Sequence, residues 1–509
     1  MGAEPPPTAA APPPQPPTGL ARLIALNASA LTIGRLLNAV LGIIGIGITS
    51  RYLGVDLFAT LVTVTAFTVL FAGFADMGVA TIGARELAKR PDDTRRLLDS
   101  LFTIGIALQL FAAAIVIASA SIVYSGTDGS VERESILLLV LPPLLLSGAA
   151  APATAYLLAA QRGYAAAVAS TVASVAMTLI LVLAVTLDLG FTAVLIAHVA
   201  QSIAFVAVML AFALPRIRFL PSWDPALSKQ LLGWALPLGV VLILTSLYWR
   251  IDIVLLSIVG TQQDVGIYGL AYKVADTFYV IPAFVMVTLL PAFARLAQDA
   301  GRRDELVQKM TTVMPVAVAP LVVLTVAFAD EITTIAGGDD FDGAAPVLQI
   351  LMFGVAAGFL RAVLTEALIA VNRQVWLMYA TGALLAVNVA LNLVLIPVLG
   401  ARGAAAAFAA SEAVALVLVA LLFRRIGVMP RPHQMPQLLM ASAAMAGVTL
   451  LKLVPLAVAV GPVATIVVLG PLSVVVYVAC LYALGAMPRE VDSTLVAPAL
   501  ATLRELRRR

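Results

Sequence analysis

Several kinds of residue are scarce in this chain of 509 residues, and each shortage excludes a class of protein. The chain contains one cysteine, Cys480, and two histidines, His198 and His433. A single cysteine cannot form an internal disulfide framework, and this set of residues does not supply the ligands of a typical zinc site. The sequence has no GxxxxGK[ST] loop, so it encodes no P-loop for ATP.

Charge is also scarce. Asp, Glu, Lys and Arg make up 12% of the residues, whereas hydrophobic residues make up 61%. The mean hydropathy is +1.03. Apolar runs recur from end to end, and each is long enough to cross a bilayer as a helix. The formal net charge of +3 gives no indication of a nucleic-acid partner. We therefore predict an all-α polytopic membrane protein with little room for a soluble domain.

The apolar runs predict about fourteen transmembrane helices joined by short connections. Residues 1–21 precede them and are rich in proline and alanine, so we expect a disordered tail rather than a signal peptide. The helices are expected near residues 27–50, 57–84, 100–123, 135–160, 166–187, 191–214, 230–258, 265–293, 310–329, 344–371, 375–397, 403–423, 437–454 and 463–485.

Basic residues are distributed unevenly between the connections. The connections after even-numbered helices hold seventeen Lys and Arg residues, and those after odd-numbered helices hold three, Arg51, Arg133 and Arg402. Because basic loops remain in the cytoplasm, we expect the even connections and both termini to be cytoplasmic. Residues 486–509, which end in three arginines, are expected to form a basic cytoplasmic tail.

The chain contains an internal repeat. Leu158-Ala-Ala-Gln-Arg162 resembles Ile369-Ala-Val-Asn-Arg373, and each precedes two apolar runs separated by a turn with a glycine. Six helices per unit give both units the same topology, and parallel repeats of this kind bind substrates between them. We therefore predict two parallel six-helix lobes, residues 22–216 and 229–425, followed by two additional helices within 437–485.

Short motifs occur in a fixed order along residues 25–425. They are Arg51-Tyr-Leu-Gly54, Asp76-Met-Gly78 and Ala84-Arg-Glu-Leu87; then Arg250-Ile-Asp252, Val265-Gly-Ile-Tyr268, Pro282 and Leu290-Pro291; then Asp342-Gly-Ala-Ala-Pro346 and Ala370-Val-Asn-Arg-Gln374. In order and spacing this pattern resembles the polysaccharide flippases of the multidrug/oligosaccharidyl-lipid/polysaccharide exporter (MOP) superfamily. The resemblance implies two lobes around a central cavity that opens alternately to each side. It also implies transport of a polyprenyl-pyrophosphate-linked oligosaccharide, such as an O-antigen or capsule repeat unit, across the inner membrane of a bacterium.

Charged residues inside the predicted helices supply the candidate site, because such charges usually face a cavity, a partner or a substrate path. The cargo implied by the resemblance is strongly anionic, and cations that face a cavity could replace its lost hydration. The candidates for this role are Arg35, Arg250, Lys273 and Arg361. The carboxylates Asp76, Asp252, Asp276 and Glu366 could couple transport to protons or sodium, or could pair with the cations. By helical spacing Lys273 can pair with Asp276, whereas Arg250 cannot pair with Asp252.

Alternative functions remain open at this point. The same fold would serve a lipid II flippase or a multidrug/cation exporter. A membrane glycosyltransferase or polymerase would use an acidic motif, for which the loop Gly338-Asp339-Asp340-Phe341-Asp342 is the candidate. The short outer loops argue against that enzyme, so we expect a transporter rather than an enzyme, with no cofactor. The expected partners are membrane lipid, the lipid-linked sugar, and a polysaccharide polymerase or glycosyltransferases, without nucleic acid.

Overall fold

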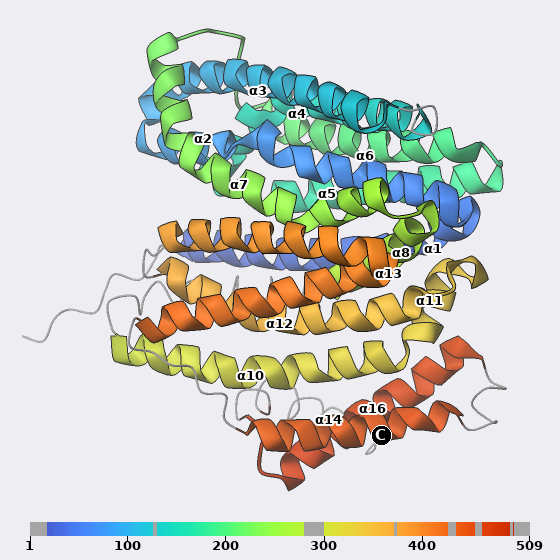
Figure 1. Cartoon of the computed structure of the whole chain (residues 1–509). Coiled ribbons are helices and arrows are strands. Elements are labelled where there is room, and N and C mark those ends of the chain that lie inside the picture. Colours follow the sequence, from blue (N-terminus) through green and yellow to red (C-terminus); the bar gives the residue numbers. More distant parts are fainter. Residues whose placement is uncertain are drawn as a thin grey trace, which may run out of the picture.

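The computed structural model describes residues 18–125, 130–278, 300–370, 374–425, 434–453, 461–488 and 492. This part of the chain is helical and contains no strand. The helices lie side by side: the blue-to-green helices of the first half gather together, α10, α12 and α13 lie next to them, and α14 and α16 lie at the far edge (Figure 1). The longer elements are α1 (Thr18–Asp76), α2 (Val79–Lys89), α3 (Thr94–Val123), α4 (Ser130–Ala159), α5 (Tyr164–Thr186), α6 (Gly190–Ala213), α7 (Pro225–Val259), α8 (Gln262–Phe278), α10 (Ala300–Ala327), α11 (Ala329–Gly337), α12 (Ala344–Ala370), α13 (Gln374–Arg425), α14 (Met435–Thr449) and α16 (Pro462–Ala483).

Two of these elements each contain two predicted helices. In α1 the backbone breaks at Gly54, where φ is 67°, and in α13 it breaks at Gly400, where φ is 54°. Glycine accepts these left-handed angles without steric cost, so the chain reverses direction there with almost no loop. In the described residues, 10 helices are long and apolar enough to cross a membrane, or up to 11 if the bent α4 counts as one span. The count reaches fourteen when α4 is counted as one span, α1 and α13 are each divided into two helices at their glycine, and the shorter α8 is added. The predicted fourteen helices are therefore confirmed.

Some helix boundaries in the structure differ from the predicted ones. The first helix begins at Thr18, so residues 18–21 of the predicted disordered tail are helical. Of the predicted helix 265–293, the first part is α8, and residues 279–293 lie outside the described residues. Most of the basic tail, residues 489–491 and 493–509, also lies outside them.

The connections alternate between the two ends of the bundle. At the basic end, Arg96 Nη2 lies 2.5 Å from Asp224 Oδ2, which joins the first turn of α3 to the start of α7. Asp224 also caps α7 by accepting a hydrogen bond from the amide of Leu227 at 3.1 Å. The Leu227 amide and then the Arg96 guanidinium hold the pKa of the Asp224 carboxyl below its usual value. This contact joins two of the basic connections, and the cytoplasmic location of these connections remains the prediction of the charge bias.

At the opposite end, α1 is attached to the short helix α11. Ser50, which is fully buried, donates a hydrogen bond to the carbonyl of Ala336 at 2.6 Å. Arg51 donates to the carbonyls of Thr334 and Ile335 at 3.1 and 2.9 Å. These carbonyls belong to the last turn of α11, where helix carbonyls run short of donors, and the carbonyl of Thr334 also accepts from the amide of Gly338. Ser50 and Arg51 thus add to the C-terminal cap of α11.

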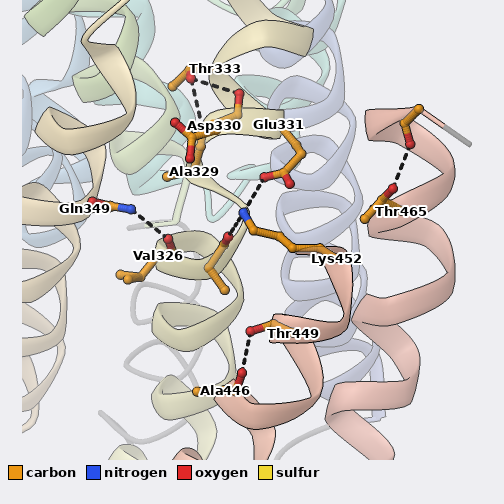
Figure 2. A network of polar contacts seen from close by, with 12 residues as sticks. Val326, Ala329, Asp330, Glu331, Thr333, Gln349, Ala446, Thr449, Lys452 and Thr465 are labelled. Carbon is orange, nitrogen blue, oxygen red and sulfur yellow. Dashed lines mark hydrogen bonds and ion pairs between the residues drawn. The ribbon is translucent and has the colours of Figure 1, made fainter. Parts of the chain in front are cut away.

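The additional helices α14 and α16 are fixed to the second half of the bundle at one charged contact. Lys452, in the 3₁₀ turn Leu450–Leu453 after α14, donates to the carbonyl of Ala327 at 2.5 Å. Its ammonium also pairs with Glu331 at 3.0 Å, and both side chains are less than one fifth exposed. Figure 2 shows Lys452 reaching from α14 into the break between α10 and α11. The ammonium therefore supplies a partner for the C-terminal end of α10.

We expect Lys452→Met to destabilise the folded protein by about 1–3 kcal/mol, because Glu331 and a helix-end carbonyl then lose their charged donor. The measurement is denaturant unfolding of the purified protein for Lys452→Met, Glu331→Gln and the double variant. The two single effects should sum to more than the effect of the double variant, since both remove the same contact. Fully additive effects would show that the contact contributes nothing.

Candidate substrate cavities

Two adjoining cavities lie among the helices of the first half of the chain. The first has a volume of about 550 Å³ and the second about 600 Å³. They share a wall formed by Thr68, Pro143, Ser174, Gln201 and Ser202. Helices α1, α4, α5 and α6 line both cavities, α8 closes the first, and α2 and α3 close the second. Each volume is within the usual range for a small-ligand site.

The first cavity brings together two of the predicted cations. Arg35 reaches it from α1, and Lys273 reaches it from α8 together with Asp276 one turn later. Among the described residues, no ion pair with Lys273 is found; Asp276 pairs with Arg250 instead, at 3.3 Å. Arg35 and Lys273 thus bring two basic side chains to the wall, and the negative charge of Asp276 in the same wall is offset by Arg250.

Arg250 has a different position from Arg35 and Lys273. Besides its ion pair with Asp276, its guanidinium lies 5.0 Å from the centre of the Tyr272 ring, and its side chain is 19% exposed. It does not line either of the two cavities. Helical spacing predicted that Arg250 does not pair with Asp252 on its own helix. In the structure its partner is Asp276, on α8. The contacts hold α7 against α8.

Asp252 lies in the core rather than at a cavity. It is 1% exposed and accepts hydrogen bonds from the hydroxyl of Tyr268 and from the amide of Ile253, the latter at 2.8 Å. A carboxylate without access to water needs such donors. The side chain of Glu366 lies outside the described residues, although its backbone belongs to α12.

Arg361 forms a buried ion pair that the sequence did not reveal. Its Nε and Nη2 lie 2.9 and 3.0 Å from the two carboxylate oxygens of Glu412, which is fully buried. Tyr248 donates a third hydrogen bond to Glu412 at 2.6 Å. The pair joins α12 to the second half of α13 and α7, and Arg361 is not part of either cavity wall. Glu412 is a single acidic residue in an apolar run, and this is the signal that could have identified it as a buried partner.

Asp76 lines the second cavity together with residues that carry amides and hydroxyls. Gln109, on α3, is 5% exposed and donates to the carbonyl of Ala75 at 3.3 Å. Its Oε1 has no hydrogen-bond partner among the described residues. This wall thus holds several polar groups but none of the cations that line the first cavity.

Solved structures with the same arrangement of helices define the class of protein. A lipid II flippase, MurJ, in an inward closed conformation aligns with 89% of this chain and 98% of its own, with a TM-score of 0.72 at 12% identity. An inward-facing multidrug resistance transporter of the MATE family of the MOP superfamily aligns with 78% of this chain and 98% of its own, with a TM-score of 0.56 at 15% identity. The chain thus shares the fold of these two membrane proteins.

The family follows from the sequence itself. Residues 48–346, more than half of the chain, match the polysaccharide biosynthesis protein family, and the protein belongs to that family. A probable low-salt glycan biosynthesis flippase of Haloferax volcanii, Agl15, is 29% identical over 178 residues, which are 34% of this chain and 37% of the relative. The match therefore spans little more than a third of that flippase. The family and fold predicted from the short motifs are confirmed.

Proposed function

We propose that this protein flips a polyprenyl-pyrophosphate-linked oligosaccharide across the cytoplasmic membrane of a bacterium, by alternating access, for the assembly of surface polysaccharide. The observation that carries the proposal is the first cavity, which Arg35 of α1 and Lys273 of α8 both line. Membership of the polysaccharide biosynthesis family supports the glycan as cargo. Transport of this kind needs no covalent intermediate.

The physical problem is the transfer of a diphosphate through an interior of low dielectric constant. An anion that leaves water loses several kcal/mol of hydration unless cations and hydrogen-bond donors replace it. A guanidinium and an ammonium in one cavity wall provide that replacement. The prenyl chain can remain in the lipid while the head group passes through the cavity.

Energy coupling is a further part of the proposal. Among the described carboxylates, Asp276 both lines the first cavity and pairs with Arg250. A proton or sodium ion that neutralised Asp276 would release Arg250, and this would link ion binding to the contact between α7 and α8. A polysaccharide polymerase and glycosyltransferases are the proposed partners, since they supply and consume the lipid-linked glycan.

Two alternatives make different predictions. A lipid II flippase shares the fold, and loss of such a protein should be lethal, whereas loss of a flippase for surface polysaccharide should not. A glycosyltransferase would need the acidic loop as its metal site, but Asp339, Asp340 and Asp342 are exposed and Phe341 between them is buried against Phe58. Within the described residues, no group of three side chains suited to a metal is found.

The test is Arg35→Ala combined with Lys273→Ala in a strain that lacks the native gene. Surface polysaccharide should fall by at least about tenfold at equal protein level, because each lost charged hydrogen bond is worth roughly 1.5–3 kcal/mol. Lys229→Ala with Arg402→Ala is the matched control, since it removes two exposed basic residues outside both cavities. Normal polysaccharide from the Arg35/Lys273 variant would contradict the proposal.

A further inference from the structure

We infer that the second cavity is a saccharide subsite that is physically separate from the diphosphate subsite in the first. This inference rests on the proposed function and extends it by dividing the substrate between the two compartments. Asp76, Gln109 and Gln201 are the residues assigned to the sugar. Asp76 then serves as an acceptor for sugar hydroxyls.

The chemistry of the second wall matches that of a saccharide. A sugar presents many hydroxyls, each of which donates and accepts hydrogen bonds, and apolar C–H faces between them. The wall offers carboxylate, amide and hydroxyl groups, with Phe205 and aliphatic side chains among them. Most of its exposed lining is apolar, with a small number of polar groups that can fix an orientation.

Gln109 provides an independent indication of a missing partner. Its amide nitrogen is bound to the Ala75 carbonyl, which fixes the side chain, while Oε1 finds no donor in the described part of the chain. Buried polar atoms are rarely left without a partner, since an unmade hydrogen bond costs about 1–3 kcal/mol. A hydroxyl of a bound sugar, or a water molecule that it orients, would supply the donor.

Electrostatics excludes the diphosphate from this compartment. Asp76 is the one ionisable side chain in the second wall, and a carboxylate repels phosphate oxygens at short range. The first wall holds Arg35 and Lys273, and its one carboxylate, Asp276, is already paired with Arg250. The two compartments therefore attract different parts of one molecule.

The shared wall fits the covalent structure of the substrate. In a glycosyl diphosphate, the first sugar is bonded directly to the second phosphate, so the sugar must lie next to the diphosphate. Ser174, Gln201 and Ser202 line both compartments and would contact this junction. A diphosphate held in the first cavity thus places its sugar at the opening of the second.

The experiment compares two ligands on the full chain in lipid nanodiscs. One is the lipid-linked oligosaccharide isolated from the organism that makes this protein, and the other is the same polyprenyl diphosphate without sugar. We expect the wild type to bind the glycosylated lipid at least about tenfold more tightly, equivalent to one good hydrogen-bonding group or about 1.4 kcal/mol. Asp76→Asn combined with Gln109→Leu, both in the wall of the second cavity alone, should abolish this preference and leave the affinity for the bare diphosphate unchanged.

Three controls keep the outcomes distinct. Thr154→Phe fills the second cavity from α4 and should remove the sugar preference without changing Asp76. Asp92→Asn, at an exposed position outside both cavities, should have no effect. Arg35→Ala with Lys273→Ala should weaken the binding of both lipids.

Equal affinity of the wild type for the two lipids would overturn the saccharide subsite while leaving the proposed function in place. The same holds if the Asp76/Gln109 variant keeps the full preference. Failure of the wild type to bind either lipid would overturn the proposed function itself, and the subsite with it.

Discussion

Arg361→Met is expected to destabilise the protein by about 3–5 kcal/mol, because it leaves the carboxylate of Glu412 buried without its countercharge. Glu412 is fully buried, and both of its oxygens are bound to the guanidinium. The remaining donor, the hydroxyl of Tyr248, cannot neutralise a charge. Most of the Arg361→Met protein should therefore fail to reach the folded state in the membrane.

Removal of both charges should be much less harmful than removal of one. In Arg361→Met with Glu412→Leu the buried charge is absent, and replacement of a buried pair by apolar residues is often close to neutral. Tyr248→Phe, added to the double variant, removes the hydroxyl that donates to Glu412 in the wild type. The measurement is unfolding of the purified variants in detergent by SDS, with folded yield as a second readout.

Arg95→Met serves as the comparison, since Arg95 is 77% exposed and lies 4.0 Å from Asp99. An exposed pair of this kind contributes about 0–1 kcal/mol. If the double variant were as unstable as Arg361→Met alone, the loss would arise from packing rather than from an unpaired charge.

The second large effect concerns two glycines at opposite ends of the bundle. A Cβ on Gly73 of α1 would lie 3.0 Å from the Cα of Ile243 in α7. A Cβ on Gly266 of α8 would lie 2.6 Å from the carbonyl oxygen of Val55, beyond the break in α1. In both places the obstacle is backbone, which cannot rotate away as a side chain could. The second half of α1 therefore touches α7 near the basic end and α8 near the other end.

We expect Gly73→Val and Gly266→Val to bias the protein in opposite directions. Overpacking costs about 1–3 kcal/mol, which shifts an equilibrium between two conformations by roughly 5- to 150-fold. Gly73→Val should open the basic end and Gly266→Val the opposite end. Both should reduce transport strongly, since alternating access requires each end to close in turn.

The direction of opening can be measured with a single cysteine. After replacement of Cys480, the one cysteine in the chain, a cysteine is placed at Thr68, which lines both cavities. An impermeant thiol reagent is then applied from each side of oriented vesicles. Gly447→Val is the control, because a Cβ at Gly447 meets nothing within 4 Å. Labelling that rises from the same side in both glycine variants would contradict the two-ended mechanism.

The helices and their order could be predicted because the information is local. An apolar run long enough for the bilayer must form a helix, since lipid offers no partner for backbone polar groups. The short turns at Gly54 and Gly400 separate runs that are hydrophobic on both sides, so the spans were recognised although the helices are almost continuous. The start at Thr18 was missed, because the helix extends past the apolar run into the end of the proline-rich tail.

The candidate site could be predicted only as a set of residues. Charges are so costly inside a membrane that each one is a candidate, and from the resulting set Arg35 and Lys273 line the first cavity. Spacing along one helix suggested that Lys273 pairs with Asp276, yet Asp276 pairs with Arg250 across two helices. Spacing could not connect Arg361 with Glu412, which is 51 residues away.

The sequence by itself thus determined the class of protein, the number of spans and the short list of charged residues, because hydropathy and helical spacing act over a few residues. The tertiary structure alone decided which cations face a cavity and which are neutralised. That choice depends on how helices from distant parts of the chain pack, since a partner such as Glu412 or Asp276 reaches its arginine only across a helix–helix contact.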